Sequence, residues 1–197
     1  MAVRLAYSRT GKRERGFSLI EVVIVGTIGI IVTAMAVPMV MTAVNSYRLR
    51  SSVVDLNTLL QRARIQAIRD NKSYNIGWDL SGTRVFAETV SVNGTWDSGE
   101  PMVMLQQRVS LYTGNSNPAI SGLGFTPSTT NLGFTSRGVP CSGVVPACST
   151  WSGANQQVGF VFYLQSTNGG NNSWGAISVS PSGRFRSWNY SGGTWTY

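Results

Sequence analysis

The feature that most constrains this chain is an apolar run that begins at Phe17 and contains one acidic residue, Glu21. Between Phe17 and Arg48, Glu21 is the only charged residue. About 20 consecutive apolar residues are enough for a helix to span the hydrocarbon core of a bilayer. An ionised carboxylate at the bilayer centre costs on the order of 2.5–3.5 kcal/mol. The run therefore predicts one membrane-spanning helix in which Glu21 needs a partner.

The segment before the apolar run is basic. Residues 1–16 contain five of the chain's 16 Lys and Arg residues and one of its eight acidic residues. Positive charge beside a spanning helix keeps that flank in the cytoplasm, so we expect the rest of the chain on the other side of the membrane. Subtracting the +4 of residues 1–16 from the total of +8 leaves +4 for the rest. This mild excess permits polyanion binding but does not require it.

The order of these features resembles the prepilin signature of the type IV filament superfamily, which comprises type IV pilins and type II secretion pseudopilins. The matching features are the basic leader, Gly16, the stretch from Phe17 to Glu21 (FSLIE), the apolar run and Pro38. The resemblance implies that a prepilin peptidase of the inner membrane cleaves after Gly16 and methylates the amino group of Phe17. Glu21 is then the fifth mature residue, where the family's glutamate neutralises the amino terminus of a neighbouring subunit. Pro38 falls where many pilins have a helix-breaking proline.

Two simpler interpretations of the apolar run remain. An ordinary secretory signal peptide would be cleaved after the run, and Ala34-Met35-Ala36 loosely fits such a site. A plain signal anchor with a chance glutamate is the other interpretation. Neither accounts for an acid near the amino end of the run, close to the glycine. For Glu21 itself, the alternative to pairing is a carboxyl near the membrane interface that takes up a proton.

A second helical pattern follows the apolar run and ends near Asn71, a residue type common just past a helix end. Apolar residues recur at spacings of three and four, which predicts an amphipathic helix. We therefore expect a membrane half over residues 17–46 and an amphipathic half over residues 47–71. Glycine and proline are the expected points of bending or melting, at Gly26, Gly29 and Pro38. The apolar stripe consists of Val53, Leu56, Leu60, Ala63 and Ala67.

Residues 72–197 change to an apolar period of two, which is typical of strands. The predicted fold class is α+β: a long amino-terminal helix packed on an antiparallel sheet or a small β-sandwich. We expect residues 114–157 to form long loops with one short strand. The expected strands cover 73–79, 83–90, 102–112, 132–135, 156–165, 174–181, 184–190 and 194–197.

Cys141 and Cys148 are the only cysteines, and six residues separate them. In an oxidising compartment the expected outcome is a disulfide, which in so short a loop contributes about 2–3 kcal/mol. Their spacing does not fit a C-x-x-C redox or zinc motif. Histidine, the commonest general base, is absent from the sequence. We therefore predict no enzyme activity, no catalytic residues, no metal site and no cofactor.

Two short segments, LGFTSRG at 132–138 and ISVSPSGRFR at 177–186, resemble the GspH/FimT (FimU-like) family of minor pilins and pseudopilins. The resemblance implies a minor pilin of a type IV pilus, in the initiating or tip complex, or a minor pseudopilin of a type II secretion system. The implied partners are other pilins or pseudopilins, the prepilin peptidase and the inner-membrane assembly platform. The implied location is the inner membrane, with one span and a periplasmic carboxy-terminal domain, and then the filament.

The second of these segments also suggests a nucleic-acid site. In a strand, Arg184 and Arg186 lie on one face and Phe185 on the other. Two guanidiniums so placed can contact neighbouring phosphates, and Trp188 on the same face can stack on a base. Arg137 is a weaker candidate for the same surface.

The spacing of these arginines also carries a resemblance. Some FimT-type minor pilins have a G-R-x-R motif here that binds DNA during natural transformation, and residues 183–186 fit it. The implied partner is DNA. The alternative is that the two arginines are solvated or pair with Asp97 or Glu100.

Overall fold

The structure is a computed structural model that describes residues 16–197 except 115, 129–130, 145–147, 153–155 and 169–170. The chain divides into two compact units, residues 1–42 and 43–197. Helix α1 (Leu19–Arg69) contributes its first part to one unit and the remainder to the other. Each unit is described separately.

The described part of the first unit, residues 16–42, consists of the start of α1 and the three residues before it. Ser18 ends the non-helical segment, and its carbonyl accepts hydrogen bonds from Glu21 N at 3.0 Å and Val22 N at 3.2 Å. The helix contains a stretch long and apolar enough to cross a membrane, none of it buried in the structure. The backbone stays helical through Gly26, Gly29 and Pro38, so melting at these positions stays a prediction.

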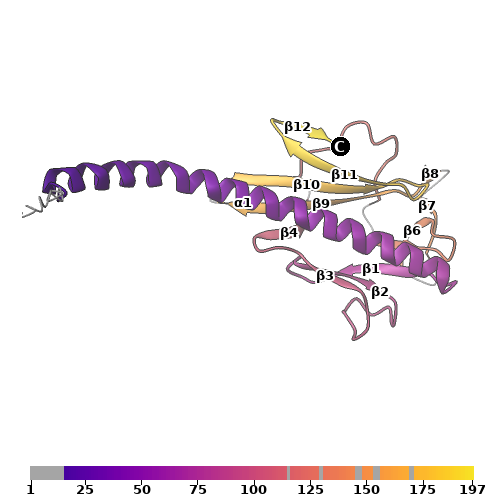
Figure 1. The fold of residues 1–197 in the computed structure, drawn as a ribbon. Helices are drawn as coiled ribbons and strands as arrows, with labels where there is room; N and C mark the ends of the chain where they lie inside the picture. The colour runs from indigo at the N-terminus through magenta and orange to yellow at the C-terminus, as the bar shows by residue number, and fades with distance from the viewer. Residues whose placement is uncertain (1–15, 115, 129–130, 145–147, 153–155, 169–170) are drawn as a thin grey trace, which may run out of the picture. The chain divides into compact units, whose positions relative to one another are not determined.

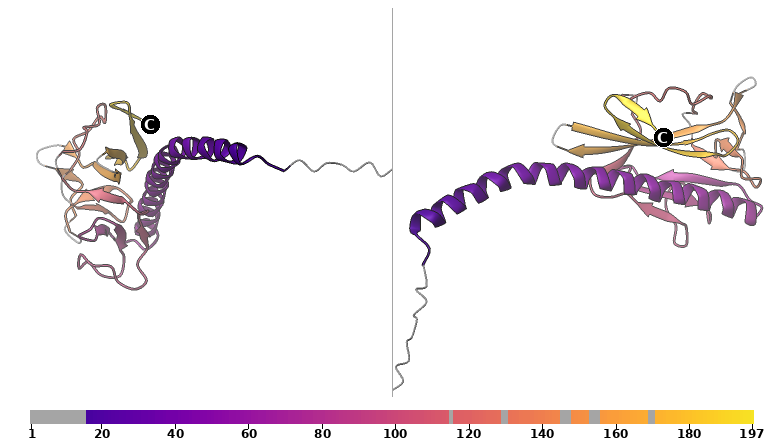
Figure 2. Two further views of the ribbon diagram at one scale, coloured as in Figure 1. Left: turned by 90° about the vertical axis from the view of Figure 1, so that its left-hand side faces the viewer. Right: turned by 45° about the horizontal axis from the view of Figure 1, so that its top comes forward.

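The second unit contains residues 43–69 of α1 and two five-stranded antiparallel sheets (Figures 1 and 2). One sheet has the order β3-β2-β1-β5-β6, and the other has the order β12-β11-β10-β9-β4. Strands β7 and β8 form a separate pair. The strands are β1 (Tyr74–Trp78), β2 (Arg84–Glu88), β3 (Met102–Met104), β4 (Val109–Tyr112), β5 (Leu132–Phe134), β6 (Pro140–Ser142), β7 (Trp151–Ser152), β8 (Gln156–Gln157), β9 (Phe160–Asn168), β10 (Asn171–Val179), β11 (Phe185–Ser191) and β12 (Thr194–Thr196).

The core of the second unit lies between α1 and the two sheets. The predicted apolar stripe of the helix is buried from Val53 to Ala67, and it packs in one cluster with residues of both sheets. Burial of this apolar surface is the main force that holds the layers together. The α+β prediction is therefore confirmed. Sheet residues in the cluster include Ile76, Val85, Phe134, Leu164, Ile177 and Val179.

The carboxyl end of α1 has the geometry expected of a helix that stops at an asparagine. Asn71 has a φ of 51°. Its N–H donates to Ile68 O at 3.3 Å, and Lys72 N donates to Ala67 O at 3.1 Å. This pair of bonds is the Schellman motif, in which a left-handed residue closes the last turn. The predicted end of the helix is confirmed.

The prediction of one continuous strand over residues 102–112 is wrong. Strand β3 lies at the edge of one sheet and β4 at the edge of the other, so the chain crosses between the sheets at residues 105–108. Arg108 has a φ of 66° in this crossing. Gln106 N donates to Ser52 Oγ of α1 at 3.0 Å, which attaches the crossing to the helix. Apolar residues alternate on both sides of the crossing, so the sequence pattern did not indicate that the chain changes sheets there.

The region 114–157 also has more strand than predicted. Strands β5, β6, β7 and β8 lie within it, where we expected one short strand in long loops. The expected strand over 156–165 is likewise divided, because β8 pairs with β7 and β9 begins at Phe160. The Cys141–Cys148 disulfide is present, with Cys141 buried on β6. These strands have two or three residues each, too few to show a period in sequence.

Candidate functional site

The residues at the predicted cleavage site lie in the first unit, before the helix begins. Phe17 is 81% exposed, and a Cβ built on Gly16 would meet no atom within 4 Å. The bond between them is therefore outside regular structure and open to solvent. Residues 1–15 of the predicted leader lie outside the described residues.

Glu21 lies in the first turn of α1 and is exposed. A carboxylate is favourable there because it faces the positive end of the helix dipole. Among the described residues, no side chain pairs with it. A partner for Glu21 in an apolar environment must therefore come from another molecule or from outside the described residues.

Threonines in the apolar part of α1 donate their hydroxyls to backbone carbonyls of the same helix. Thr27 donates to Val23 O at 2.8 Å, and Thr33 donates to Gly29 O at 2.7 Å. Thr42 donates to the carbonyl of Pro38 at 3.0 Å. Polar groups in lipid must be satisfied within the protein, and these bonds do that.

The predicted arginine surface is built on the hairpin of β10 and β11. The turn is closed by Gly183 N, which donates to Ser180 O at 2.7 Å, and Gly183 has a φ of 80°. Arg186 lies opposite Ser178 of β10. Phe185 points to the other face, where its ring lies 6.1 Å from that of Phe134. The expected alternation of this strand is confirmed.

Within the described part of the chain, neither Arg184 nor Arg186 has an acidic partner. Arg184 is exposed and Arg186 is half-buried. Among the described residues the only ion pair joins Arg69 and Asp70. The charges at positions 184 and 186 are therefore available to a ligand.

The alternative pairing with Asp97 or Glu100 is not found, because both acids bind within their own loop. Glu100 accepts hydrogen bonds from Val90 N at 3.1 Å and Asp97 N at 3.0 Å. Asp97 accepts from Asn93 Nδ2 at 3.0 Å and from the hydroxyl of Ser91.

Trp188 does not have the exposure that stacking on a base requires. Its side chain is 4% exposed, packs against Ile120 and Ala176, and donates from Nε1 to Ser178 Oγ at 2.8 Å. Trp188 is therefore a core residue beneath the arginines, and its prediction as a DNA-stacking residue is corrected. The alternation of side chains along β11 predicted the correct face for Trp188, but the loop that carries Ile120 covers that face.

The accessible aromatic residue beside the arginines is Tyr197, which sequence reasoning did not single out. It is 83% exposed, and the Arg186 guanidinium lies 5.1 Å from the centre of its ring. The hairpin of β11 and β12 brings it beside Trp188, with the ring centres 5.0 Å apart. A terminal tyrosine gives no signal of this placement in sequence.

Sequence reasoning also missed Arg64 of α1. Its Nε donates to Gly138 O at 2.9 Å, and its Nη1 donates to Gly183 O at 2.7 Å. One guanidinium thus joins the helix to the two segments that resemble the GspH/FimT family. The bonds place Arg137 and Arg184 on turns that adjoin the same side chain. The period of the helix put Arg64 outside the apolar stripe and gave no hint of these partners.

Glycine is required at both positions that contact Arg64. Gly138 and Gly183 have φ angles of 71° and 80°, which L side chains rarely adopt. A Cβ at Gly183 would lie 2.8 Å from the Arg64 guanidinium carbon, and one at Gly138 would lie 2.6 Å from Ile68 Cδ1. The glycines of the two segments therefore have a structural role, separate from any role of the arginines next to them.

No family model and no curated protein matches this chain. Two solved structures resemble it. One is the type IV minor pilin FimU of Pseudomonas aeruginosa PAO1, at 15% identity and a TM-score of 0.45, over 77% of this chain and 94% of that one. The other is the minor pseudopilin EpsH of the Vibrio cholerae type 2 secretion system, at 12% identity and a TM-score of 0.45, over 72% and 97%. A likeness at this level concerns the fold, and we assign the chain to no family on it.

We predict that Arg64→Met lowers the free energy of unfolding by about 1.5–3 kcal/mol, because it removes charged hydrogen bonds to two carbonyls. Chemical denaturation of the full chain in detergent, followed by tryptophan fluorescence, measures the change. Arg62→Met is the matched control, because Arg62 is exposed on the same helix. Equal effects of the two substitutions would contradict the assigned role of Arg64.

Proposed function

We propose that this chain is a membrane-anchored, non-enzymatic subunit of a type IV pilin-like filament, specifically a minor pilin of the initiating or tip complex. The observation that carries the proposal is the exposed apolar start of α1, with Glu21 in its first turn and the Gly16-Phe17 bond just before it. The second unit is a separate compact domain of helix and sheets.

Assembly follows from burial of the exposed apolar helix. Side chains from Phe17 to Val44 are exposed in the isolated chain, so they need lipid or other helices around them. Packing against neighbouring subunits covers them without exposing backbone polar groups. Cleavage after Gly16 gives Phe17 a charged amino terminus. In a dry bundle, the Glu21 carboxylate of a neighbour neutralises that charge and sets the register.

A minor pseudopilin of a type II secretion system has the same anatomy. The resemblance of the amino-terminal segment and the described fold support both assignments equally. Genes beside that of this chain distinguish the two, because each filament system is built by its own set of pilins, peptidase and platform. In either system we propose that the chain spans the inner membrane once, with its carboxy-terminal domain in the periplasm before assembly.

We predict that co-expression with a prepilin peptidase removes residues 1–16 and adds one methyl group to Phe17. Mass spectrometry of the intact protein measures both changes. Gly16→Leu should leave the chain at full length, because it replaces the glycine of the predicted cleavage site with a branched side chain. Gly26→Ala, inside the helix, is the control and should be processed normally. Cleavage near Ala36 would instead identify an ordinary signal peptide.

We predict that Glu21→Gln is cleaved and methylated like the wild type but is at least tenfold depleted in sheared filaments. The reason is that an uncompensated buried charge costs about 3–5 kcal/mol. Quantitative immunoblotting of filament and membrane fractions measures the depletion. Ser18→Ala, at the start of the same helix, is the control. Normal incorporation of Glu21→Gln would contradict the pairing role.

A second candidate function is DNA binding by Arg184 and Arg186, with Arg137 on the adjoining turn. The observation that favours it is the absence of acidic partners for Arg184 and Arg186 among the described residues. Tyr197, rather than Trp188, is the exposed ring next to them. Phosphate contacts would supply most of the affinity, and ring stacking would add to it.

We predict that Arg184→Ala/Arg186→Ala reduces the salt dependence of DNA binding by about one contact for each arginine. Titration of the full chain with single- and double-stranded oligonucleotides at several salt concentrations measures the slope. Arg62→Ala/Lys72→Ala removes the same charge from exposed positions outside this surface and is the control. If both double variants lose affinity equally, the binding is a nonspecific effect of net charge.

A further inference from the structure

The two arginines of β11 border a pocket rather than a flat surface. The pocket has a volume of about 220 Å³ and lies where the β10–β11 hairpin meets the loop that carries Leu123 and Phe125. We name it the Ser178 pocket, after the residue of β10 that lines it together with Trp188 of β11. Serines of the hairpin turn and both arginines line it as well.

Ser178 has a hydroxyl proton that no described residue accepts. Its side chain is 3% exposed, and its Oγ accepts the indole N–H of Trp188 at 2.8 Å. An indole can only donate, so the proton of the Ser178 hydroxyl needs a different acceptor. Among the described residues no acceptor is found. The pocket thus contains a buried donor that a ligand oxygen can satisfy.

The turn of the hairpin supplies a second donor. Arg184 N donates to Ser180 Oγ at 3.1 Å, which fixes the place of that hydroxyl. Ser180 Oγ in turn lies 2.9 Å from Ser182 Oγ. One hydrogen bond between two hydroxyls uses one of their two protons. The other proton remains for a ligand at the rim of the pocket, where Ser182 is exposed.

The charge of the pocket has one sign. Arg184 and Arg186 line it, and none of the described residues that line it is acidic. A guanidinium group carries only donors and stays protonated at any physiological pH. The serines and arginines therefore offer donors and positive charge together, which is the chemistry that recognises an oxyanion.

We propose that the Ser178 pocket binds the terminal phosphate monoester of a nucleic-acid strand. The hydroxyl of Ser178 and one hydroxyl of the turn donate to phosphate oxygens. Arg184 and Arg186 balance the charge of the group, which is about −1.5 to −2 at neutral pH. This inference rests on the second candidate function, DNA binding, and names the part of the strand that this pocket takes.

A terminal phosphate fits the pocket better than an internal phosphodiester does. It has one ester bond and three free oxygens, so it can enter end-on and reach a hydroxyl as buried as that of Ser178. An internal phosphodiester has the chain on both sides and a charge of about −1, which one arginine balances. Tyr197 favours a nucleic acid over other monoesters, because its exposed ring lies 5.1 Å from the Arg186 guanidinium and can stack on the terminal base.

The test compares two thymidine pentanucleotides, one with a 5′-phosphate and one with a 5′-hydroxyl, both labelled at the 3′ end. Fluorescence anisotropy of the labels measures their binding to the full chain in detergent micelles. We expect the 5′-phosphorylated strand to bind at least tenfold more tightly. Equal binding would overturn the terminal-phosphate assignment and leave DNA binding in place. Binding of neither strand would overturn both.

The dependence on pH gives a second readout. A phosphate monoester has a second pKa of about 6, whereas a phosphodiester does not titrate in this range. The sequence contains no histidine, so no side chain with an ordinary pKa near 6 obscures the comparison. Lowering the pH from about 7 to about 5 protonates the monoester and should weaken its binding, with little change for the 5′-hydroxyl strand. Equal pH dependence of the two strands would contradict the proposal.

One variant locates the binding. Ser182→Leu keeps both arginines and places an apolar group at the exposed rim of the pocket. It should abolish the preference for the 5′-phosphate and leave binding of the 5′-hydroxyl strand unchanged. Ser173→Leu, exposed on β10 outside the pocket, is the control and should keep the preference. A preference retained by Ser182→Leu would refute the location, and displacement of the strand by glucose 6-phosphate as effective as by unlabelled strand would refute the nucleic-acid assignment.

Discussion

Burial of one face of α1 against both sheets is the interaction on which the second unit depends. The two sheets have no strand in common, and the crossing between β3 and β4 is attached to the helix at Ser52. Without the buried stripe from Val53 to Ala67, the inner faces of both sheets would be left without their shared core. The helix therefore positions both sheets, and through Arg64 it also holds the turns at Gly138 and Gly183.

Arg64 extends this dependence from the core to the surface. It lies one residue after Ala63 of the stripe, so its position is set by the same packing. Its two hydrogen bonds then fix the turns at Gly138 and Gly183. Glycine is required at both positions of this contact, because both have positive φ angles and both adjoin the helix side chains. The two glycines of this chain therefore have a structural reason that is independent of what the neighbouring arginines bind.

What the sequence predicted and what it missed differ in the range of the interactions involved. The helical stripe, the end at Asn71 and the faces of Arg184, Phe185 and Arg186 depend on local periods and turn chemistry, and they were predicted. The change of sheet near Arg108 and the contacts of Arg64 depend on interactions between segments far apart in sequence. No periodic pattern in the sequence indicates such interactions. The burial of Trp188 is of this second kind, since it depends on a loop that lies over the sheet.

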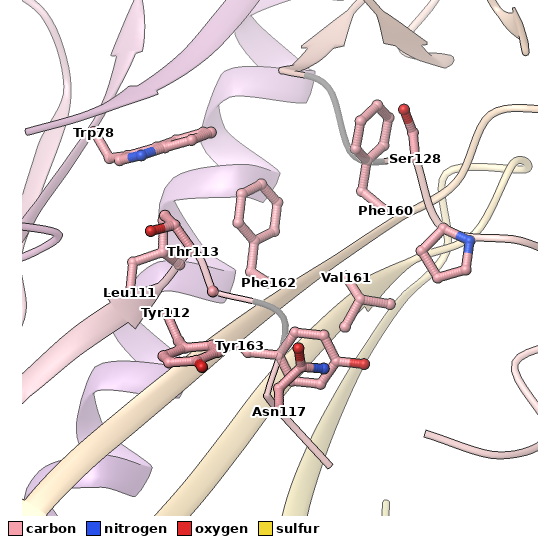
Figure 3. A pocket seen from close by; sticks show the side chains of 12 residues that line it. Trp78, Leu111, Tyr112, Thr113, Asn117, Ser128, Phe160, Val161, Phe162 and Tyr163 are labelled. Atoms are coloured by element: carbon pink, nitrogen blue, oxygen red, sulfur yellow. The ribbon is translucent and has the colours of Figure 1, made fainter. Parts of the chain in front are cut away.

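Two surfaces of the second unit offer opposite chemistry to their surroundings. The turns at Gly138 and Gly183 present arginines without acidic partners among the described residues, which suits a polyanion. A hollow of about 330 Å³ at the β4 side of the sheet that contains β11 is lined by Trp78, Tyr112 and Phe162 among others (Figure 3), and none of its lining residues is charged. A polyanion gains little from this hollow. Salt therefore weakens contacts at the arginines and leaves contacts in the hollow unaffected, because screening acts only on contacts that involve charge.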